Sequence, residues 1–434
     1  MNEVRNILIG YELGAETSQI SYYDRSLKDA VSVPARVGSN LYSFPTSLLK
    51  ARGEDEWHFG FEADYFEKRG EGIPVRNLTD KLGTGFTLSV DGKKMGAADL
   101  LAVFFRESLK LLGLKDPLRS IGGIAVTADD LTAEKALQIR RALGMAGFSP
   151  DRCFVLSLPE SFYYYGYSQK PDVWTRGMML IRFAGDNVTC DRLAEQRSGK
   201  PHTVSVTRRG EASLPRESEA RDAAFSRLVK EWSGGLLCSG LFITGNGFKR
   251  EWAKQSIKAL GSAASHVYEG DNLFVKGACL AVYEKLEHFA FSDRIFLSSH
   301  LVRASLGVDV LDRGKPVTLP LIRAGVSWYE NETACELVID DSPEAGSYLD
   351  REAEEERFLM LTLSPMGRGR HRNIRFPLQG FPSRAGGAFR VLLTARCLGA
   401  DSCEVRARDL GFGELFPASG AEAEITVSLS EVDA

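Results

Sequence analysis

The sequence predicts a duplicated α/β scaffold over its N-terminal two-thirds, followed by an all-β domain that we expect to be a sandwich. Three observations lead to this prediction. Strand-like and helix-like segments alternate up to about residue 290, the same order of segments occurs twice, and alternating apolar and polar residues without helical periodicity fill the remainder. A chain of 434 residues is also long enough for two or three domains.

The first copy begins with two strands that meet at a tight turn containing Gly14. The later helices carry their own boundary signals, such as Thr132 as an N-cap and Gly147 just after the last turn of the same helix. In chain order, the expected elements are strands at 4–13 and 17–23, a helix at 99–112, a strand from 122, a helix at 132–146, a strand from 153 and a helix opened by Pro159 and Glu160.

The second copy repeats this order around another glycine-containing turn. Its expected elements are two strands within 178–193, helices at 217–232, 249–260 and 275–288, and strands at 240–245 and 266–268. We assign the first lobe to about 1–170 and the second to about 175–290, which makes residues 1–290 one two-lobe domain. Two similar lobes facing one another predict a ligand-binding cleft between them.

From about residue 295 to residue 434 the sequence changes character. Alternating runs start at Ala334, Arg357, Phe389 and Glu424, and turns rich in Gly, Pro and Asp separate them. We place the domain boundary within 290–299. The basic run GRGRHR from Gly367 lies between two of these strands and is interpreted as a solvated hairpin tip.

Composition narrows the possible partners and the compartment. A net charge of -4 provides no general attraction for nucleic acid, and no apolar run reaches the length of about 18 residues that a membrane span requires. The seven cysteines are scattered, without a CxxC pair, and the histidines show no metal-ligand spacing. We therefore expect a cytoplasmic protein with reduced thiols that binds neither nucleic acid nor membrane.

The segment GYELGAETS from Gly10 carries the clearest chemical signal. A strand that ends in a glycine turn lets backbone N–H groups approach phosphate oxygens, and Glu12 is placed to hold a water of a bound magnesium ion. The segment resembles the first phosphate loop of the actin and heat-shock chaperone ATPase superfamily, and most closely its seventy-kilodalton heat-shock branch. Glycine also serves hairpin twist, so the turn alone is a weak signal.

Further segments resemble that superfamily in the same order along residues 5–290. They are GIAVTADDLTAEKALQIRRALGMAGF, LPESFYYYGYS, ITGNGFKREWAKQSIKALG and EGDNLFVKGACLAVYEKL. The full chain also resembles an uncharacterised bacterial family with such lobes and a C-terminal β domain. The resemblance implies a ribonuclease H-like fold for each lobe and ATP or ADP with magnesium in the cleft.

The resemblance also implies roles for individual residues. Glu12 and Glu160 would be catalytic in an active member, and Glu12 and Asp186 would be the metal-binding residues. Lys81 is the candidate for the lysine that reaches the phosphates. The implied cofactor-binding residues are Gly10, Glu12, Gly14, Ala15, Thr17, Lys81, Gly185, Asp186, Gly245, Asn246 and Gly247.

The second hairpin, LIRFAGDNVTCDRL, departs from the superfamily pattern. Arg182 lies near the position of the first conserved Asp, and Thr189 lies near the second. A cation in place of a carboxylate removes a magnesium ligand or a water-orienting base. Asp186 and Asp191 substitute for the missing acids if the alignment shifts. The segment that covers the adenine in the family is also short here.

Two functions follow from these features. The first is a degenerate ATPase-fold protein that acts as a protein-interaction scaffold or nucleotide sensor without efficient hydrolysis. The alternative is a slow chaperone-type ATPase, with Glu12, Glu160 and Asp186 around magnesium, that binds protein clients through its β domain. In both cases we expect a protein partner.

Overall fold

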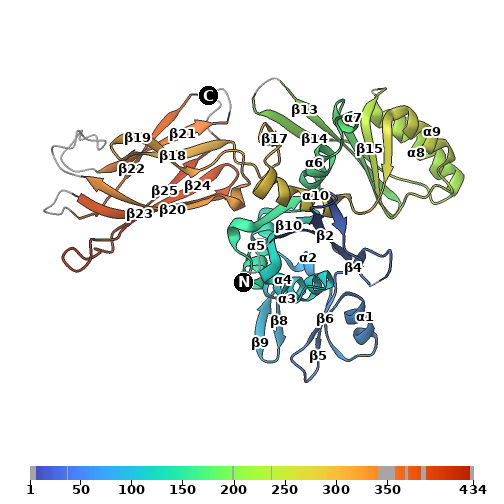
Figure 1. Ribbon diagram of the computed structural model, residues 1–434, viewed down its shortest axis with the longest axis horizontal. Coiled ribbons are helices and arrows are strands. Elements are labelled where there is room, and N and C mark those ends of the chain that lie inside the picture. Colours follow the sequence, from blue (N-terminus) through green and yellow to red (C-terminus); the bar gives the residue numbers. More distant parts are fainter. Residues whose placement is uncertain are drawn as a thin grey trace. The chain divides into compact units, whose positions relative to one another are not determined.

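The computed structural model describes residues 6–36, 38–197, 200–235, 237–340, 357–366, 370–382 and 388–430. The fold is mixed α/β with several sheets, and the chain divides into two units, Met1–Leu297 and Ser298–Ala434 (Figure 1). This division falls inside the 290–299 stretch in which the sequence places the boundary. In the described part of the chain, no helix is both long and apolar enough to cross a membrane.

Lobe I comprises residues 6–170 of the first unit. Its strands are β1 (Ile7–Leu13), β2 (Thr17–Asp24), β3 (Asp29–Ser32), β4 (Ser43–Pro45), β5 (Leu48–Ala51), β6 (Trp57–Phe59), β7 (Gly72–Val75), β8 (Thr87–Val90), β9 (Lys93–Gly96), β10 (Ile121–Ala128) and β11 (Cys153–Ser157). Its helices are α1 (Gly60–Lys68), α2 (Leu78–Lys81), α3 (Ala97–Ser108), α4 (Pro117–Ser120), α5 (Ala133–Ala146) and α6 (Leu158–Ser168).

Lobe II comprises residues 171–297. Its strands are β12 (Met178–Ala184), β13 (Asn187–Gln196), β14 (His202–Ser213), β15 (Cys238–Gly245), β16 (Ala264–Glu269) and β17 (Arg294–Phe296). Its helices are α7 (Pro171–Trp174), α8 (Ser218–Ser233), α9 (Lys254–Ala263) and α10 (Leu273–Tyr283), and a π-helical turn, Glu284–His288, continues α10.

The main sheets of the two lobes have the same topology. The strand order is β11-β10-β1-β2-β3 in lobe I and β16-β15-β12-β13-β14 in lobe II. In each sheet the first three strands are parallel, and the last two are joined antiparallel to the third as a meander. The duplication seen in the order of sequence segments is therefore present in the sheets themselves.

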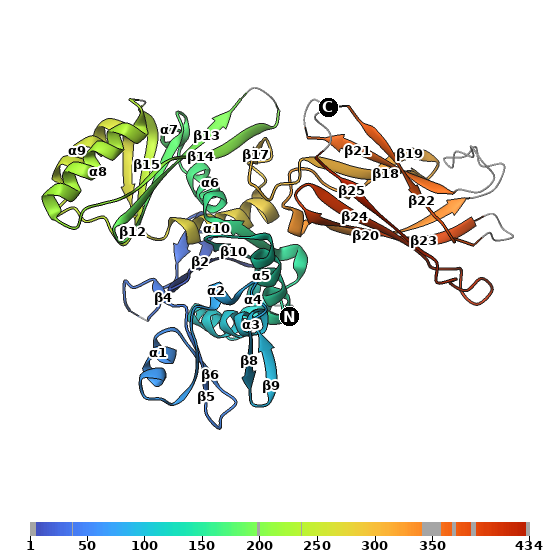
Figure 2. The ribbon, with the colours of Figure 1, turned by 180° about the vertical axis from the view of Figure 1, so that it is seen from behind.

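Each lobe contributes its last helix to the sheet of the other lobe (Figures 1 and 2). Helix α6 packs with β12 and β15 of lobe II, where Phe162 contacts Phe242. Helix α10 packs on β1, β2 and β10 of lobe I. Helices α6 and α10 are in close contact. A Cβ atom added to Gly277 of α10 would lie 2.0 Å from the carbonyl oxygen of Ser161 in α6.

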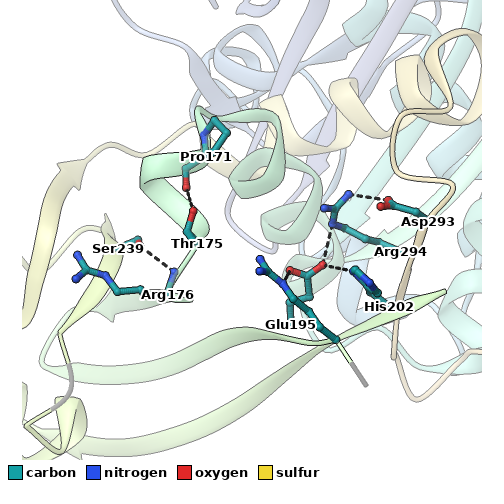
Figure 3. Close-up of polar contacts among 9 residues, drawn as sticks. Pro171, Thr175, Arg176, Glu195, His202, Ser239, Asp293 and Arg294 are labelled. Atoms are coloured by element: carbon teal, nitrogen blue, oxygen red, sulfur yellow. Dashed lines mark hydrogen bonds and ion pairs between the residues drawn. The ribbon is translucent and has the colours of Figure 1, made fainter. Parts of the chain in front are cut away.

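A polar cluster fixes the last strand of the first unit (Figure 3). Strand β17 pairs with β14 in parallel, and Arg294 Nε donates to Glu195 Oε1 at 3.0 Å. The same oxygen lies 3.0 Å from His202 Nδ1, and the Arg294 guanidinium also lies over the ring of Trp174. Burial alone would raise the pKa of Glu195, but hydrogen bonds from Arg197 and His202 and the charge of Arg294 lower it.

The second unit is all-β. It consists of β18 (Ala304–Asp312), β19 (Lys315–Ile322), β20 (Glu332–Asp340), β21 (Phe358–Pro365), β22 (Arg372–Pro377), β23 (Ala388–Gly399), β24 (Ser402–Asp409) and β25 (Glu422–Ser428). Two four-stranded antiparallel sheets, β19-β18-β21-β22 and β20-β23-β24-β25, form its two layers (Figure 1). Alternate residues are buried along β23, as the sequence alternation predicts. Of the basic run, Gly367–Gly369 lie outside the described residues.

Several element boundaries differ from the sequence prediction. The helix expected at 249–260 begins only at Lys254, because the carboxylate of Asp222 on α8 accepts the N–H groups of Gln255 and Ser256, each at 2.8 Å. Strand β14 was not predicted, although its first half alternates. Helix α3 ends at Ser108 and continues as a 3₁₀ turn to Leu112.

Candidate functional site

A cleft of about 600 Å³ lies between the two lobes. Leu13 pairs with Ala128 in lobe I, and Phe183 pairs with Gly245 in lobe II, both in parallel register. All four residues line the cleft. The carboxyl ends of the central parallel strands of both sheets thus open onto one space, which is where α/β sheets bind ligands.

The first hairpin contributes its turn to this cleft. Glu12, Gly14, Ala15 and Thr17 all line it. Gly14 is required for the turn itself, because a Cβ there would lie 2.3 Å from the carbonyl oxygen of Thr17. These four predicted residues therefore lie together.

Gly10, in contrast, lies outside the cleft lining, in the contact between β1 and α10. A Cβ on Gly10 would lie 2.1 Å from the carbonyl oxygen of Val275 and 2.4 Å from the backbone nitrogen of Cys279. The absence of a side chain at this position allows the helix to approach the strand. Helix packing, rather than phosphate approach, accounts for glycine at this position.

Glu12 is held in an environment that favours its neutral form. The pKa of Glu12 is raised to about 8, mainly by burial. The charges of Asp271 and Asp129 also raise it, whereas a hydrogen bond with the backbone of Val275 and the charge of Arg182 lower it. Its Oε2 atom is buried and has no hydrogen-bond partner among the described residues. A carboxyl group that is largely protonated at neutral pH is a poor ligand for magnesium.

Arg182 connects the two lobes across the cleft. Its Nη1 donates to Asp129 Oδ2 at 3.0 Å, from β12 of lobe II to the residue that follows β10 in lobe I. A second link joins the lobes where Gln19 Nε2 donates to the carbonyl oxygen of Asp271 at 2.9 Å. A guanidinium thus lies among the acidic groups of Glu12, Asp129 and Asp271, where the resemblance implies a metal ion.

The glycine amides of lobe II are already hydrogen-bonded. The N–H of Gly185 donates to Asn246 Oδ1 at 2.8 Å, and the N–H of Gly245 donates to Asp271 Oδ1 at 2.9 Å. Gly247 packs on the same turn, since a Cβ there would lie 2.3 Å from the carbonyl oxygen of Gly185. The three turn residues Gly185, Asn246 and Gly247 therefore stabilise each other.

Asp186 is engaged by two arginines. Its Oδ1 accepts from Arg221 at 2.7 Å and its Oδ2 accepts from Arg216 at 3.2 Å. Hydrogen bonds from Arg221 and Arg216 lower the pKa of Asp186. The carboxylate is therefore ionised, but both of its oxygens serve the arginines, and Asp186 lies outside the residues that line the cleft.

Glu160 and Lys81 lie away from the cleft lining. Glu160 is buried in the first turn of α6, where its N–H donates to the Ser157 hydroxyl at 3.3 Å. Lys81 lies at the end of α2, and its Nζ donates to the carbonyl oxygen of Arg76 at 2.6 Å. Neither residue lines the cleft, although Asp80 and Leu82 on either side of Lys81 do.

Sequence reasoning missed several residues of the cleft. Asp129 and Asp271 had no assigned role, although each follows a predicted strand within three residues and so lies at a carboxyl end. Gln19, Thr79 and Thr189 also line the cleft and carry buried oxygen atoms that lack partners among the described residues. The sequence places Thr189 near an expected Asp position, whereas for Gln19 and Thr79 only the hydrogen-bond geometry of the folded lobes gives a signal.

The arrangement does not fit a nucleotide held through magnesium. The amides of Gly185 and Gly245 already have acceptors, and Arg182 occupies the surroundings of Glu12. Within the described ranges, no group of three or more His, Cys, Asp or Glu residues is placed to hold a metal ion. What the cleft offers instead is a set of carboxyl, amide and hydroxyl oxygens beside one interlobe ion pair.

Comparison with known families identifies both units. A family model described as "Family of unknown function (DUF5716) C-terminal" matches residues 29–299. A second model, "Domain of unknown function (DUF8552)", matches residues 301–429. No curated protein matches the chain. The two matched regions meet near the division between the units at Leu297.

Proposed function

The chain belongs to the DUF5716 C-terminal family, and we propose that it is a degenerate ATPase-fold protein that acts as a protein-interaction scaffold without efficient nucleotide hydrolysis. The observation that carries the proposal is the ion pair between Arg182 and Asp129 across the cleft. Phosphoryl transfer depends on a positioned metal ion and a positioned nucleophile. The Arg182 guanidinium, paired with Asp129, and a largely protonated Glu12 would position neither a metal ion nor a nucleophile.

The relation to the actin and heat-shock chaperone superfamily is part of this proposal. It is supported by the identical strand order of the two main sheets and by the exchange of α6 and α10 between the lobes. The phosphate-loop resemblance around Gly14 agrees with the position of that turn in the cleft. Fold-level likeness suggests an ancestry, whereas the site residues decide the chemistry.

The scaffold role is supported by an apolar loop on the β unit, residues 410–421 between β24 and β25. Leu415 is 88% exposed at this loop, and Phe416 is 41% exposed. The loop is ordered at its base, where Asp409 accepts the N–H groups of Gly411 and Ser419 at 3.1 and 2.8 Å. A preorganised loop with exposed apolar side chains loses little entropy on docking to a protein.

The first experiment tests the lack of hydrolysis. We expect the purified full chain with ATP and magnesium to show no phosphate release above the rate without protein. Release that disappears in Glu12→Ala but persists in Glu414→Ala, an exposed glutamate of the β unit, would overturn the proposal in favour of a slow chaperone-type ATPase.

The second experiment tests the scaffold surface. We expect Leu415→Asp to abolish co-purification of native protein partners, because a buried carboxylate would oppose docking. Leu27→Asp is the matched control, since Leu27 is a leucine of lobe I that is 67% exposed. Equal partner recovery with Leu415→Asp and Leu27→Asp would place the interaction surface elsewhere.

A further inference from the structure

Four buried oxygen atoms without hydrogen-bond partners among the described residues belong to residues that line the interlobe cleft. They are Glu12 Oε2, Gln19 Oε1, Thr79 Oγ1 and Thr189 Oγ1. Gln19 is only 9% exposed. An unsatisfied buried polar group destabilises the fold, so the gathering of four such atoms around one cavity indicates a ligand that satisfies them. The amide oxygen of Gln19 can only accept, so a ligand that satisfies it must donate a hydrogen bond.

The charge of the cleft lining indicates that this ligand is positively charged. Its described lining contains five acidic side chains, Glu12, Asp80, Asp129, Asp130 and Asp271, against two basic ones, Lys135 and Arg182. Without Glu12, which is largely protonated at neutral pH, the acidic side chains still outnumber the basic ones by two. A cleft lined mainly by one sign of charge concentrates ligands of the opposite sign.

The lining of the cleft suits an organic cation. No metal-holding group of three or more His, Cys, Asp or Glu residues occurs within the described ranges. A volume of about 600 Å³ suits a small molecule, and apolar side chains such as Leu13, Ile139 and Phe274 line the cleft between the polar groups. Methylene segments fit the apolar lining, and ammonium groups fit the acceptors.

We propose that the interlobe cleft binds a small organic polycation of the aliphatic polyamine class, with its ammonium groups donating to the unpaired oxygens of Glu12, Gln19 and Thr189. The proposal goes beyond the scaffold function and does not depend on it. ATP turnover and polyamine binding are separate measurements, so either proposal can fail without the other.

The test uses isothermal titration calorimetry of the full chain with spermidine as the probe, in 150 mM salt. We expect one site per chain, and a dissociation constant at least tenfold weaker in Glu12→Gln and in Thr189→Val. Glu251→Gln removes an exposed carboxylate of lobe II that does not line the cleft, and it should leave the affinity unchanged.

Thermal melting of each variant without ligand establishes that it is folded before its affinity is compared. Thr189→Val keeps the size and branching of the side chain, so it provides a second test if Glu12→Gln proves unstable. No heat with spermidine, equal affinity in all variants, or equal binding of Mg²⁺ alone at the same site would each overturn the proposal.

Discussion

At the scale of single residues, Glu12 shows how the fold changes a side chain's chemistry. The pKa of Glu12 rises from 4.5 to about 8, mainly because the side chain is buried. Between about pH 4.5 and pH 8, the folded protein therefore keeps a proton on Glu12 that the unfolded chain has lost. Stability therefore falls as pH rises through this window, by up to about 1.4 kcal/mol per pH unit.

Glu12→Gln tests this linkage. Glutamine cannot ionise, so the variant should match the parent near pH 4.5 and exceed its free energy of unfolding at pH 8 and above. Urea unfolding at pH 5, 7 and 9 measures the difference, and Glu414→Gln serves as the exposed control. A parent and variant with the same pH dependence would show that the Glu12 carboxyl group is not held neutral by the fold.

At the scale of elements, the contact between β1 and α10 depends on a missing side chain. Gly10 lets the backbone of α10 approach at Val275 and Cys279, and Gly277 lets α10 approach α6. Interiors are close-packed, and these contacts are with backbone atoms that cannot rotate away. The exchange of helices between the lobes thus requires glycine at both positions.

We expect Gly10→Ala to lower the free energy of unfolding by about 3 kcal/mol, the upper part of the usual range for overpacking. Gly144→Ala is the matched control, because Gly144 lies in helix α5 with open space at its Cβ position. There alanine should stabilise the protein by about 0.5–1 kcal/mol, since it favours the helix. Chemical denaturation of both variants gives the comparison. A tolerated alanine at Gly10 would mean that α10 is not packed this closely.

At the scale of the whole molecule, the first unit extends beyond the 1–290 domain expected from the sequence. Strand β17 lies at its end, and Arg294 bonds to Glu195, whose side chain is only 6% exposed. Without Arg294, Glu195 would lose one charge-assisted hydrogen bond and keep its contacts with Arg197 and His202. Strand β17 therefore contributes to the stability of the lobes, although it lies next to the β unit in the sequence.

Two truncated chains test this assignment. We expect 1–297 to unfold cooperatively, as an independent unit should. We expect 1–290 to be less stable by at least about 2 kcal/mol, because it loses the hydrogen bond of Arg294 to Glu195 and the buried ring of Phe296. The difference should shrink as pH falls below about 4.5, because the unfolded chain then takes up a proton at Glu195, whereas the folded pKa of this group is lowered. Equal melting temperatures of the two fragments would mean that β17 does not stabilise the lobes and only connects the two units.

Local sequence signals were sufficient for much of the secondary structure. Helix α5 begins after Thr132, whose hydroxyl accepts from the N–H of Lys135, and it ends at Gly147 in the left-handed conformation, as predicted. Helix α9 could not be placed in the same way. Its N-terminus is capped by Asp222, which is 33 residues away from Gln255 along the chain. A cap supplied by a distant residue leaves no local signal.

The sequence by itself determined the alternation of strands and helices in the first part, the repeat of that alternation and the change to an all-β second part. These features depend on hydrophobic periodicity and on residue identity, both of which are local. Only the tertiary structure decided that Gly10 serves helix packing, that Asp186 is bound by two arginines, and that Arg182 pairs with Asp129. Burial, pKa and hydrogen-bond partners depend on groups that are distant in sequence and meet only when the lobes fold together.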